Sequence, residues 1–198
     1  MKGNALIHYV KYFLGMDKPE TQTTAKERGA IKKYAAGSRH AVEIGVFEGV
    51  NTVTIAAAMH PEGKLIGIDP FFKGRLGICY HEKIARKGIS KAKLNEKVKL
   101  LPVFSYDAVH EIPGDIDFIF IDGDHSYDGF TRDWNDWSGK VKTGGIIALH
   151  DTAEPPHDSS VKELGSYKYF NDQVRSDKRF EIIETVDSLN VLKRIITG

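Results

Sequence analysis

Carboxylate and imidazole side chains directly follow two of the apolar segments in this sequence. Residues 118–121 lead into Asp122 and His125, and a second apolar run leads into His150 and Asp151. A carboxylate can hold a divalent cation, and an imidazole titrates near neutral pH, where it can accept or release a proton. Side chains of these types, if they are brought together, could bind a charged ligand or move a proton during a reaction.

A glycine-containing segment follows an earlier apolar run. Residues 43–49 read Glu-x-Gly-x-x-x-Gly, between a predicted strand and a predicted helix. Glycines there let the backbone approach a ligand, and a helix N-terminus offers free N–H groups. This spacing differs from the Gly-x-Gly-x-x-Gly of dinucleotide-binding folds, and the acidic Glu43 favours an ammonium-bearing ligand over a pyrophosphate. Asp69 ends the next apolar run, at a place where a carboxylate commonly binds the ribose hydroxyls of a nucleoside.

These residues must be positioned by secondary structure, and short apolar segments alternate with longer amphipathic ones along the chain. The pattern predicts strands at 40–45, 64–69, 97–103, 117–122 and 146–151, followed by a hairpin of strands 180–186 and 189–195 that turns at 187–188. It predicts helices at 5–14, 23–37, 51–59, 77–94, 105–111, 127–141 and 161–175. Strands that alternate with helices are typical of a doubly wound, mostly parallel α/β sheet, here closed by an antiparallel pair.

Local signals sharpen several of these boundaries. Thr24 and Glu27 are spaced as a capping box, and Gly37 is a stop signal for the same helix. One face of the helix predicted at 127–141 carries Phe130, Trp134, Trp137 and Val141. A turn is expected at 143–145 before the fifth strand. In an open parallel sheet, ligands bind outside the carboxyl ends of the strands, so the polar strand ends described above predict one shared site.

Composition limits the class of protein. The chain has 198 residues, of which 41% are hydrophobic and 28% charged, and its formal net charge is +1. This favours a single domain over residues 1–198 and gives no field that would attract nucleic acid or an anionic membrane. The single cysteine, Cys79, fits a reducing compartment, and we expect a cytoplasmic protein.

The order Glu43-x-Gly45-x-x-x-Gly49, then Asp69, then Asp122, resembles the class I S-adenosylmethionine-dependent methyltransferases. The segments FIDGDHSYDGFTRDW and GGIIALHDT more narrowly resemble the small metal-assisted O-methyltransferase branch, which includes catechol-type enzymes and bacterial sugar and natural-product O-methyltransferases. The likeness runs from about residue 24 to the C-terminus. It implies a Rossmann-like doubly wound sheet with an antiparallel C-terminal strand. It also implies methyl transfer from S-adenosylmethionine to a hydroxyl of a sugar, phenol or natural product.

The resemblance also implies roles for individual residues. The cofactor-binding positions are Glu43, Gly45, Gly49, Asn51, Asp69, Ser105 and Asp122. The metal-ligand positions are Asp122, His150 and Asp151. His125 matches a proposed general base. Ser105 falls near the adenine, and the preceding Phe104, which stands where the family often has an acidic or amide residue, could stack on the base.

The sequence departs from the family pattern at one of the three predicted metal ligands. Relatives often carry a carboxylate where this chain has His150, and Mg²⁺ prefers oxygen ligands. An imidazole would weaken a magnesium site or shift its preference toward a transition metal. Alternatively, Asp122 and Asp151 hold the ion with several waters, or no metal binds.

Other functions remain open on the residues alone. One is a metal-independent methyltransferase with His125 as its base, and another is a metal-dependent hydrolase using Asp122, Asp124, His125 and Asp151. A nicotinamide-dependent oxidoreductase is disfavoured by the glycine spacing, and a non-catalytic cofactor-binding protein is the fourth alternative. The N-terminal helices, within residues 1–37, are expected to cover the acceptor site or to form a homodimer contact.

Overall fold

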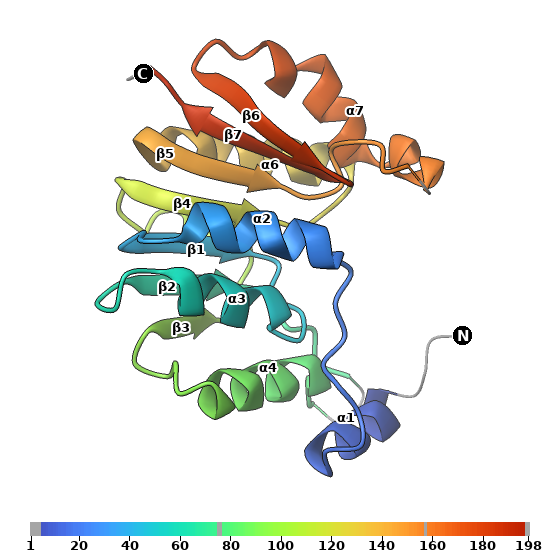
Figure 1. Cartoon of the computed structure of the whole chain (residues 1–198). Helices are drawn as coiled ribbons and strands as arrows, with labels where there is room; N and C mark the ends of the chain where they lie inside the picture. Colours follow the sequence, from blue (N-terminus) through green and yellow to red (C-terminus); the bar gives the residue numbers. More distant parts are fainter. Residues whose placement is uncertain (1–4, 75–76, 157, 197–198) are drawn as a thin grey trace.

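The computed structural model describes residues 5–74, 77–156 and 158–196, and in this part of the chain a seven-stranded sheet has the order β3-β2-β1-β4-β5-β7-β6 (Figure 1). The strands are β1 His40–Ile44, β2 Lys64–Ile68, β3 Val98–Leu101, β4 Ile116–Ile121, β5 Val141–Leu149, β6 Phe180–Val186 and β7 Leu189–Arg194. The helices are α1 Ala5–Phe13, α2 Ala25–Ala35, α3 Val50–Ala58, α4 Tyr80–Lys91, α5 Ser105–Ala108, α6 Tyr127–Trp137 and α7 Gly165–Asp172.

The direction of the strands confirms the predicted fold class. Strands β1 to β5 pair in parallel, whereas β7 is antiparallel to both β5 and β6. The chain moves outward from β1 to β3 in one direction and from β4 to β6 in the other. The crevice at the carboxyl ends of β1 and β4 is therefore the switch point at which such sheets bind ligands.

Side-chain alternation along the central strand builds a core on each face of the sheet. On β4, Phe118 and Phe120 pack with the apolar residues of α2 and α3, while Ile119 and Ile121 pack with those of α6. Figure 1 shows α2 and α3 in front of the sheet and α6 behind it. Because both faces are covered, every residue of the strand from Phe118 to Ile121 is apolar, and Asp117 near its start accepts hydrogen bonds from the backbone at the start of β1. Of the helices in the described residues, none is long and apolar enough to cross a bilayer.

The signals at the ends of α2 are confirmed. The Thr24 side chain accepts a hydrogen bond from the Glu27 N–H, and the Glu27 carboxylate accepts one from the Thr24 N–H. The helix ends at Ala35, and Gly37 follows with a left-handed φ of 76°. The capping box and the glycine stop therefore both form as the spacing predicts.

The segment between α6 and β5 differs from its prediction. The helix ends at Trp137, a 3-10 turn follows over Ser138–Lys140, and Val141 begins β5. The expected turn at 143–145 lies inside β5 as a bulge, where Gly144 has a φ of 80° and the pairing with β4 shifts register. Val141 is buried in the same core as the α6 aromatics. The apolar pattern therefore predicted correctly that Val141 is buried. It placed Val141 wrongly at the end of a helix, whereas this residue begins a strand.

The helix predicted at 161–175 is broken into three short pieces. These are a 3-10 helix Ser159–Glu163, the helix α7, and a second 3-10 helix Val174–Ser176. A Cβ atom on Gly165, the first residue of α7, would lie 1.9 Å from the backbone nitrogen of Tyr127. The chain must therefore turn closely against the start of α6 at this point, and this contact interrupts the helix.

Candidate active site

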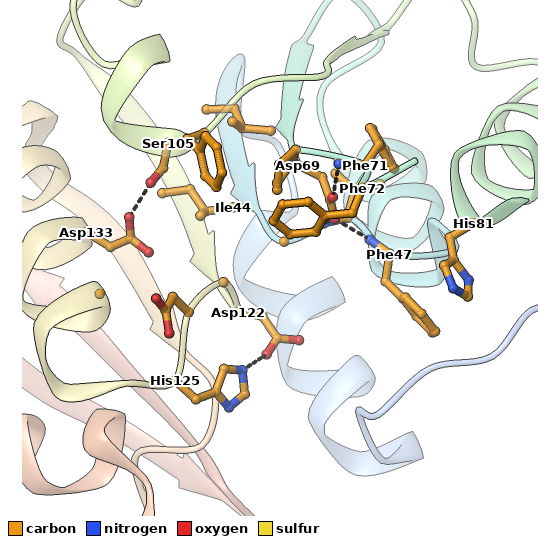
Figure 2. A pocket seen from close by; sticks show the side chains of 18 of the residues that line it. Ile44, Phe47, Asp69, Phe71, Phe72, His81, Ser105, Asp122, His125 and Asp133 are labelled. Carbon is orange, nitrogen blue, oxygen red and sulfur yellow. Dashed lines mark hydrogen bonds and ion pairs between the residues drawn. The ribbon is translucent and has the colours of Figure 1, made fainter. Parts of the chain in front are cut away.

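A cavity of about 940 Å³ opens at the carboxyl edge of the sheet (Figure 2). The predicted residues that line it are Gly45, Asn51, Asp69, Phe104, Ser105, Asp122 and His125, although the stacking of Phe104 on a base stays a prediction. Four other predicted residues, Glu43, Gly49, His150 and Asp151, do not line it. The sheet therefore brings together most of the predicted cofactor-binding positions and the predicted base.

The two glycines of the loop after β1 have different structural tasks. Gly45 has a φ of 88°, and a Cβ there would lie 1.9 Å from the backbone oxygen of Asp122. The missing side chain lets the end of β1 pack against the end of β4 at the cavity wall. Gly49 caps α3 with a φ of 78°, and its Cβ would lie 3.0 Å from Ala85 of α4. Gly49 therefore serves helix–helix packing, whereas Gly45 shapes the cavity.

Asp69 organises the backbone around the cavity. Its Oδ2 accepts hydrogen bonds from the N–H groups of Val46 and Phe47, at 3.0 and 2.9 Å. Its Oδ1 accepts one from the Phe71 N–H at 2.7 Å (Figure 2). A carboxylate has about four acceptor positions, so three protein donors leave room for a ligand hydroxyl. The ribose-binding role of Asp69 stays a prediction, and its loop-holding role is an additional one.

Glu43 of β1 precedes the glycine loop, and Asn51 of α3 follows it. Glu43 has no exposed surface, and neither of its carboxylate oxygens has a hydrogen-bond partner in the described structure. Burial raises the pKa of Glu43 well above its ordinary value, which favours the uncharged acid. Asn51 lines the cavity, and its Oδ1 accepts a 3.0 Å hydrogen bond from the Thr23 hydroxyl. Asn51 is thus the one of the pair that can face a ligand.

Ser105 is hydrogen-bonded to Asp133, an acidic residue that the sequence motifs did not predict to be part of the site. Its hydroxyl donates to Asp133 Oδ1 at 2.5 Å, and Asp133 of α6 also lines the cavity (Figure 2). Asp133 is 4% exposed, and burial raises its pKa to about 6. Its position beside Trp134 and three residues after Phe130 on the apolar face of the helix was an available signal that this carboxyl is buried.

His125 lies between two carboxylates. Its Nε2 is 3.2 Å from Asp122 Oδ1, and its Nδ1 is 2.9 Å from Asp151 Oδ2. These hydrogen bonds, first the one to Asp122 and then the one to Asp151, raise the pKa of His125 to about 9 despite its partial burial. Figure 2 shows the ring beside Asp122 at the lower wall of the cavity. Both nitrogens are oriented by acceptors, which fixes the position of the ring.

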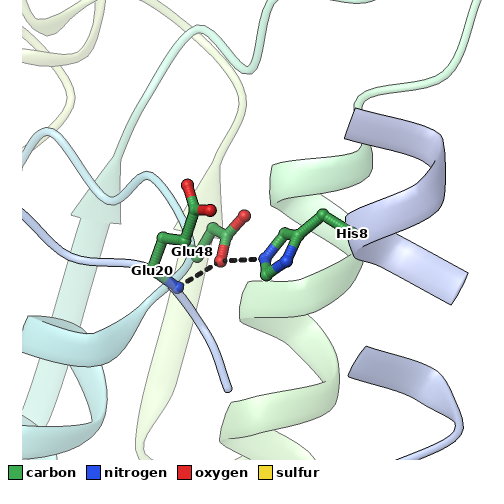
Figure 3. Close-up of side chains that lie close together, drawn as sticks. All are labelled: His8, Glu20 and Glu48. Carbon is green, nitrogen blue, oxygen red and sulfur yellow. Dashed lines mark hydrogen bonds and ion pairs between the residues drawn. The ribbon is translucent and has the colours of Figure 1, made fainter. Parts of the chain in front are cut away.

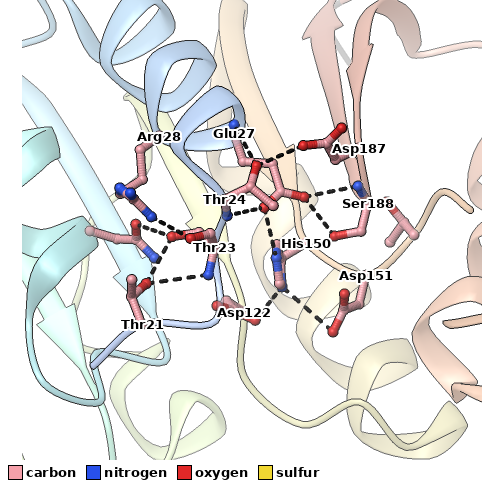
Figure 4. Close-up of polar contacts among 12 residues, drawn as sticks. Thr21, Thr23, Thr24, Glu27, Arg28, Asp122, His150, Asp151, Asp187 and Ser188 are labelled. Carbon is pink, nitrogen blue, oxygen red and sulfur yellow. Dashed lines mark hydrogen bonds and ion pairs between the residues drawn. The ribbon is translucent and has the colours of Figure 1, made fainter. Parts of the chain in front are cut away.

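His150 is buried, and it lies between Asp122 and Glu27 of α2 (Figure 4). Its Nδ1 is 3.0 Å from Asp122 Oδ1, and its Nε2 is 3.5 Å from Glu27 Oε2. Burial lowers the pKa of His150, but the two carboxylates outweigh it and raise the pKa to about 10. Glu27 also accepts 2.8 Å hydrogen bonds from the backbone and hydroxyl of Ser188. Glu27, which completes the capping box of α2, therefore also contacts His150 beside the candidate site.

Two parts of the cavity wall come from segments without a recognisable motif. Glu20, Thr21 and Gln22, which precede α2, line one side. Phe72 and His81, which flank the start of α4, line another. Nothing in the spacing of these residues marks them, because their proximity to the glycine loop depends on the path of two connecting segments.

Comparison with known proteins assigns the family. The model of a family described as a methyltransferase domain matches residues 42–152, more than half of the chain. The chain belongs to this methyltransferase family. The matched residues include the glycine loop, Asp69, Asp122 and His125, and end just beyond the His150-Asp151 pair. The resemblance recognised in the sequence is thereby confirmed.

Individual relatives agree with the family. The methyltransferase is 30% identical to a protein of Acanthamoeba polyphaga mimivirus over 156 residues, which cover 72% of this chain and 65% of the viral protein. It is 24% identical over 170 residues to a probable caffeoyl-CoA O-methyltransferase 2 of Dictyostelium discoideum, covering 80% and 70% of the two chains. The O-methyltransferase TomG of Streptomyces achromogenes, solved with its methyl donor, shares the fold with a TM-score of 0.69 at 17% identity, covering 99% of this chain and 92% of TomG.

The methyl donor of this O-methyltransferase is S-adenosylmethionine. The cavity fits it, since a volume of about 940 Å³ is ample for a nucleoside with an amino-acid tail. The residues present also fit: Gly45, Asn51 and Asp69 line the cavity, and the Asp69 carboxylate has one acceptor position more than its three backbone donors use. The alternatives of a nicotinamide enzyme and a hydrolase receive no support from the comparisons.

The predicted metal ligands do not form a compact set. Among the residues that the structure describes, Asp122, His150 and Asp151 do not bring three ligand atoms within 4.8 Å of one another. The His125 ring lies between the two carboxylates, and His150 pairs with Asp122. As they stand, these side chains do not fit a bound divalent ion, because imidazoles already neutralise the carboxylates that would hold it. Their assignment as ligands stays a prediction.

Proposed function

We propose that this methyltransferase transfers a methyl group to a hydroxyl of a small molecule (a sugar, a phenol or a related natural product) with His125 as the general base. The observation that carries the proposal is the placement of His125 on the cavity wall, fixed between Asp122 and Asp151. The relatives support a hydroxyl acceptor, since two of them are named O-methyltransferases.

The base role follows from what the two carboxylates do to the ring. S-adenosylmethionine supplies a methyl group bonded to a positively charged sulfur. A hydroxyl becomes a good nucleophile when its proton is withdrawn, and His125 can receive that proton because Asp122 and Asp151 stabilise the resulting imidazolium. The role requires the neutral ring, so only the fraction of His125 that has lost its proton is ready to act when the pH is below about 9.

We further propose that the reaction does not require a divalent ion. In relatives with metal-assisted chemistry, a cation lowers the pKa of the acceptor hydroxyl. Here the carboxylates at the corresponding positions are paired with His125 and His150, both of which the surrounding acids favour as cations. The imidazolium of His150, which is not the proposed base, thus supplies a positive charge beside Asp122.

The test is formation of S-adenosylhomocysteine from S-adenosylmethionine with a panel of catechols, flavonoids and sugars. His125→Ala should lower turnover by about 10² to 10⁴-fold, the usual contribution of a general base, while the affinity for S-adenosylhomocysteine stays within about twofold. His110→Ala, which changes an exposed histidine that does not line the cavity, is the matched control. Unchanged turnover in His125→Ala would refute the base, and loss of wild-type activity in EDTA, restored by Mg²⁺, would refute the metal-independent reaction.

The N-terminal segment is proposed to cover the acceptor side of the cavity and to contribute a homodimer contact. Residues 20–22 already lie in the cavity wall, which supports the first role. The side chains of Ile7, Val10 and Leu14 are 53%, 44% and 69% exposed, which supports the second. Sedimentation of the wild type as a dimer and of Leu14→Glu as a monomer would fit the contact. A monomeric wild type would exclude it.

A further inference from the structure

A second cluster of titratable side chains lies outside the candidate active site, around Glu48 (Figure 3). Glu48 belongs to the loop between β1 and α3, and its side chain has no exposed surface. Its Oε2 is 3.0 Å from His8 Nε2 of α1, and its Oε1 is 3.0 Å from His81 Nδ1 of α4. A buried carboxylate in the glycine loop is thus approached by imidazoles from two different helices.

The opposite side of the His8 ring is also fixed. His8 Nδ1 lies 2.9 Å from Asp17 Oδ2, and a carboxylate can only accept a hydrogen bond. A neutral ring carries one hydrogen, so one of its two nitrogens presents a lone pair to a carboxylate oxygen. When the hydrogen lies on Nδ1, that nitrogen is Nε2, 3.0 Å from Glu48 Oε2. Two lone pairs 3.0 Å apart repel unless a proton or a metal cation lies between them. A carboxylate that orients an imidazole in this way is the usual outer partner of a metal-bound histidine.

Glu20 supplies a third ligand to the same place. Its backbone N–H donates to Glu48 Oε2 at 2.5 Å, which fixes residue 20 beside the cluster. Three ligand atoms, one from each of His8, Glu20 and Glu48, lie within 4.8 Å of one another. Among residues 5–74, 77–156 and 158–196, no other group of three His, Cys, Asp or Glu residues meets this condition. Together with Asp17, the cluster holds three carboxylates beside the imidazoles of His8 and His81, and with neutral imidazoles a dication would balance most of this negative charge.

We propose that His8, Glu20 and Glu48 form a binding site for Zn²⁺. The ligands are the imidazole Nε2 and one oxygen from each glutamate, with water completing a tetrahedral shell, and Asp17 holds the imidazole from outside that shell. A nitrogen ligand beside two carboxylates favours zinc over magnesium, which prefers oxygen donors alone. Such an ion ties α1 and the segment before α2 to the glycine loop, because each contributes one ligand.

The site is distinct from the candidate active site and independent of the proposed base. Its members come from α1, residue 20 and the β1–α3 loop, whereas His125 and its partners follow β4 and β5. Glu20 and His81 nevertheless also line the cavity. Bound zinc therefore fixes part of the cavity wall, and it is expected to act on structure rather than on the proton transfer.

Calorimetric titration of the metal-stripped full chain with ZnCl₂ tests the proposal. The wild type should bind one equivalent saturably, and zinc should raise its melting temperature. His8→Ala and Glu20→Gln should lose at least about tenfold in affinity, as should Asp17→Asn through loss of its hold on the ring. Glu20 is exposed, so Glu20→Gln changes a surface side chain and nearly keeps its volume.

Two controls make the result specific. His110→Ala should bind zinc as the wild type does, because it removes an exposed histidine that lies outside the cluster. The double variant Asp122→Asn, Asp151→Asn should also keep the affinity, which separates this site from the predicted metal ligands of the candidate active site. Absence of saturable binding to the wild type, or equal binding to His8→Ala and Glu20→Gln, would overturn the proposal and leave a cluster held by protons alone.

Discussion

Replacing Asp133 by Asn should stabilise this methyltransferase at alkaline pH, although it removes a hydrogen-bonded acid from the cavity wall. Asp133 is 4% exposed, and its carboxyl faces one protein donor, the Ser105 hydroxyl. Burial raises its pKa from 3.8 to about 6. The folded protein therefore binds this proton more tightly than the unfolded chain does, and ionising the group at higher pH costs stability.

The magnitude follows from the shift in pKa. A rise from 3.8 to about 6 is roughly two units, and each unit corresponds to about 1.4 kcal/mol, so the charged carboxylate destabilises the folded state by about 3 kcal/mol above pH 7. The cost is absent below the unfolded pKa, reaches about half its value near pH 5, and is complete once the pH has risen through about 6. Weakening the bond from Ser105 offsets about 1 kcal/mol. Asp133→Asn should therefore gain about 2 kcal/mol at pH 8.

Urea unfolding at pH 5 and pH 8, followed by tryptophan fluorescence, measures this difference. The gain of Asp133→Asn over the wild type should be clearly larger at pH 8 than at pH 5. Asp128→Asn removes an exposed carboxylate from the same helix, and its effect should stay within about 0.5 kcal/mol at both pH values. The reasoning is refuted if Asp133→Asn is less stable than the wild type at pH 8, or if its gain does not depend on pH.

Three further substitutions probe the framework of the site. Gly45→Ala should destabilise the protein by more than about 4 kcal/mol, seen as a large drop in melting temperature, because its Cβ would overlap the Asp122 backbone at a φ of 88°. Glu27→Gln should cost about 3 kcal/mol in urea unfolding, since it leaves the buried His150 with less compensating charge; a loss below 1 kcal/mol would contradict the pairing. Asp69→Asn should weaken S-adenosylhomocysteine binding at least about tenfold by calorimetry, because an amide cannot accept all three backbone hydrogen bonds; unchanged affinity would separate the loop from the cofactor.

Local patterns determined much of the architecture. The alternation of apolar runs and amphipathic stretches indicated the parallel sheet and its antiparallel hairpin, and the Thr24–Glu27 spacing located the start of α2. These features depend on neighbours within a few residues, so they can be read from the chain directly. The boundary at Val141 could not be read in this way, because a buried apolar residue satisfies the end of a helix and the start of a strand equally well.

The site shows the same division. The sequence placed Gly45, Asp69, Asp122 and His125 at strand ends, and parallel strands necessarily bring their carboxyl ends to one edge. It gave no indication that Asp133 would hold Ser105, since that contact joins α5 to α6 across the face of the sheet.

Long-range contacts decided what the titratable groups do. The acids and imidazoles, and the edge of the sheet that carries most of them, could be read from the chain. The contact between His150 and Glu27, a capping-box residue more than a hundred positions earlier, depends on folding, as does the contact between His8 and the buried Glu48. The physical reason is that the charge state of a buried group depends on burial and on partners within a few ångströms, and packing, not sequence spacing, chooses those partners.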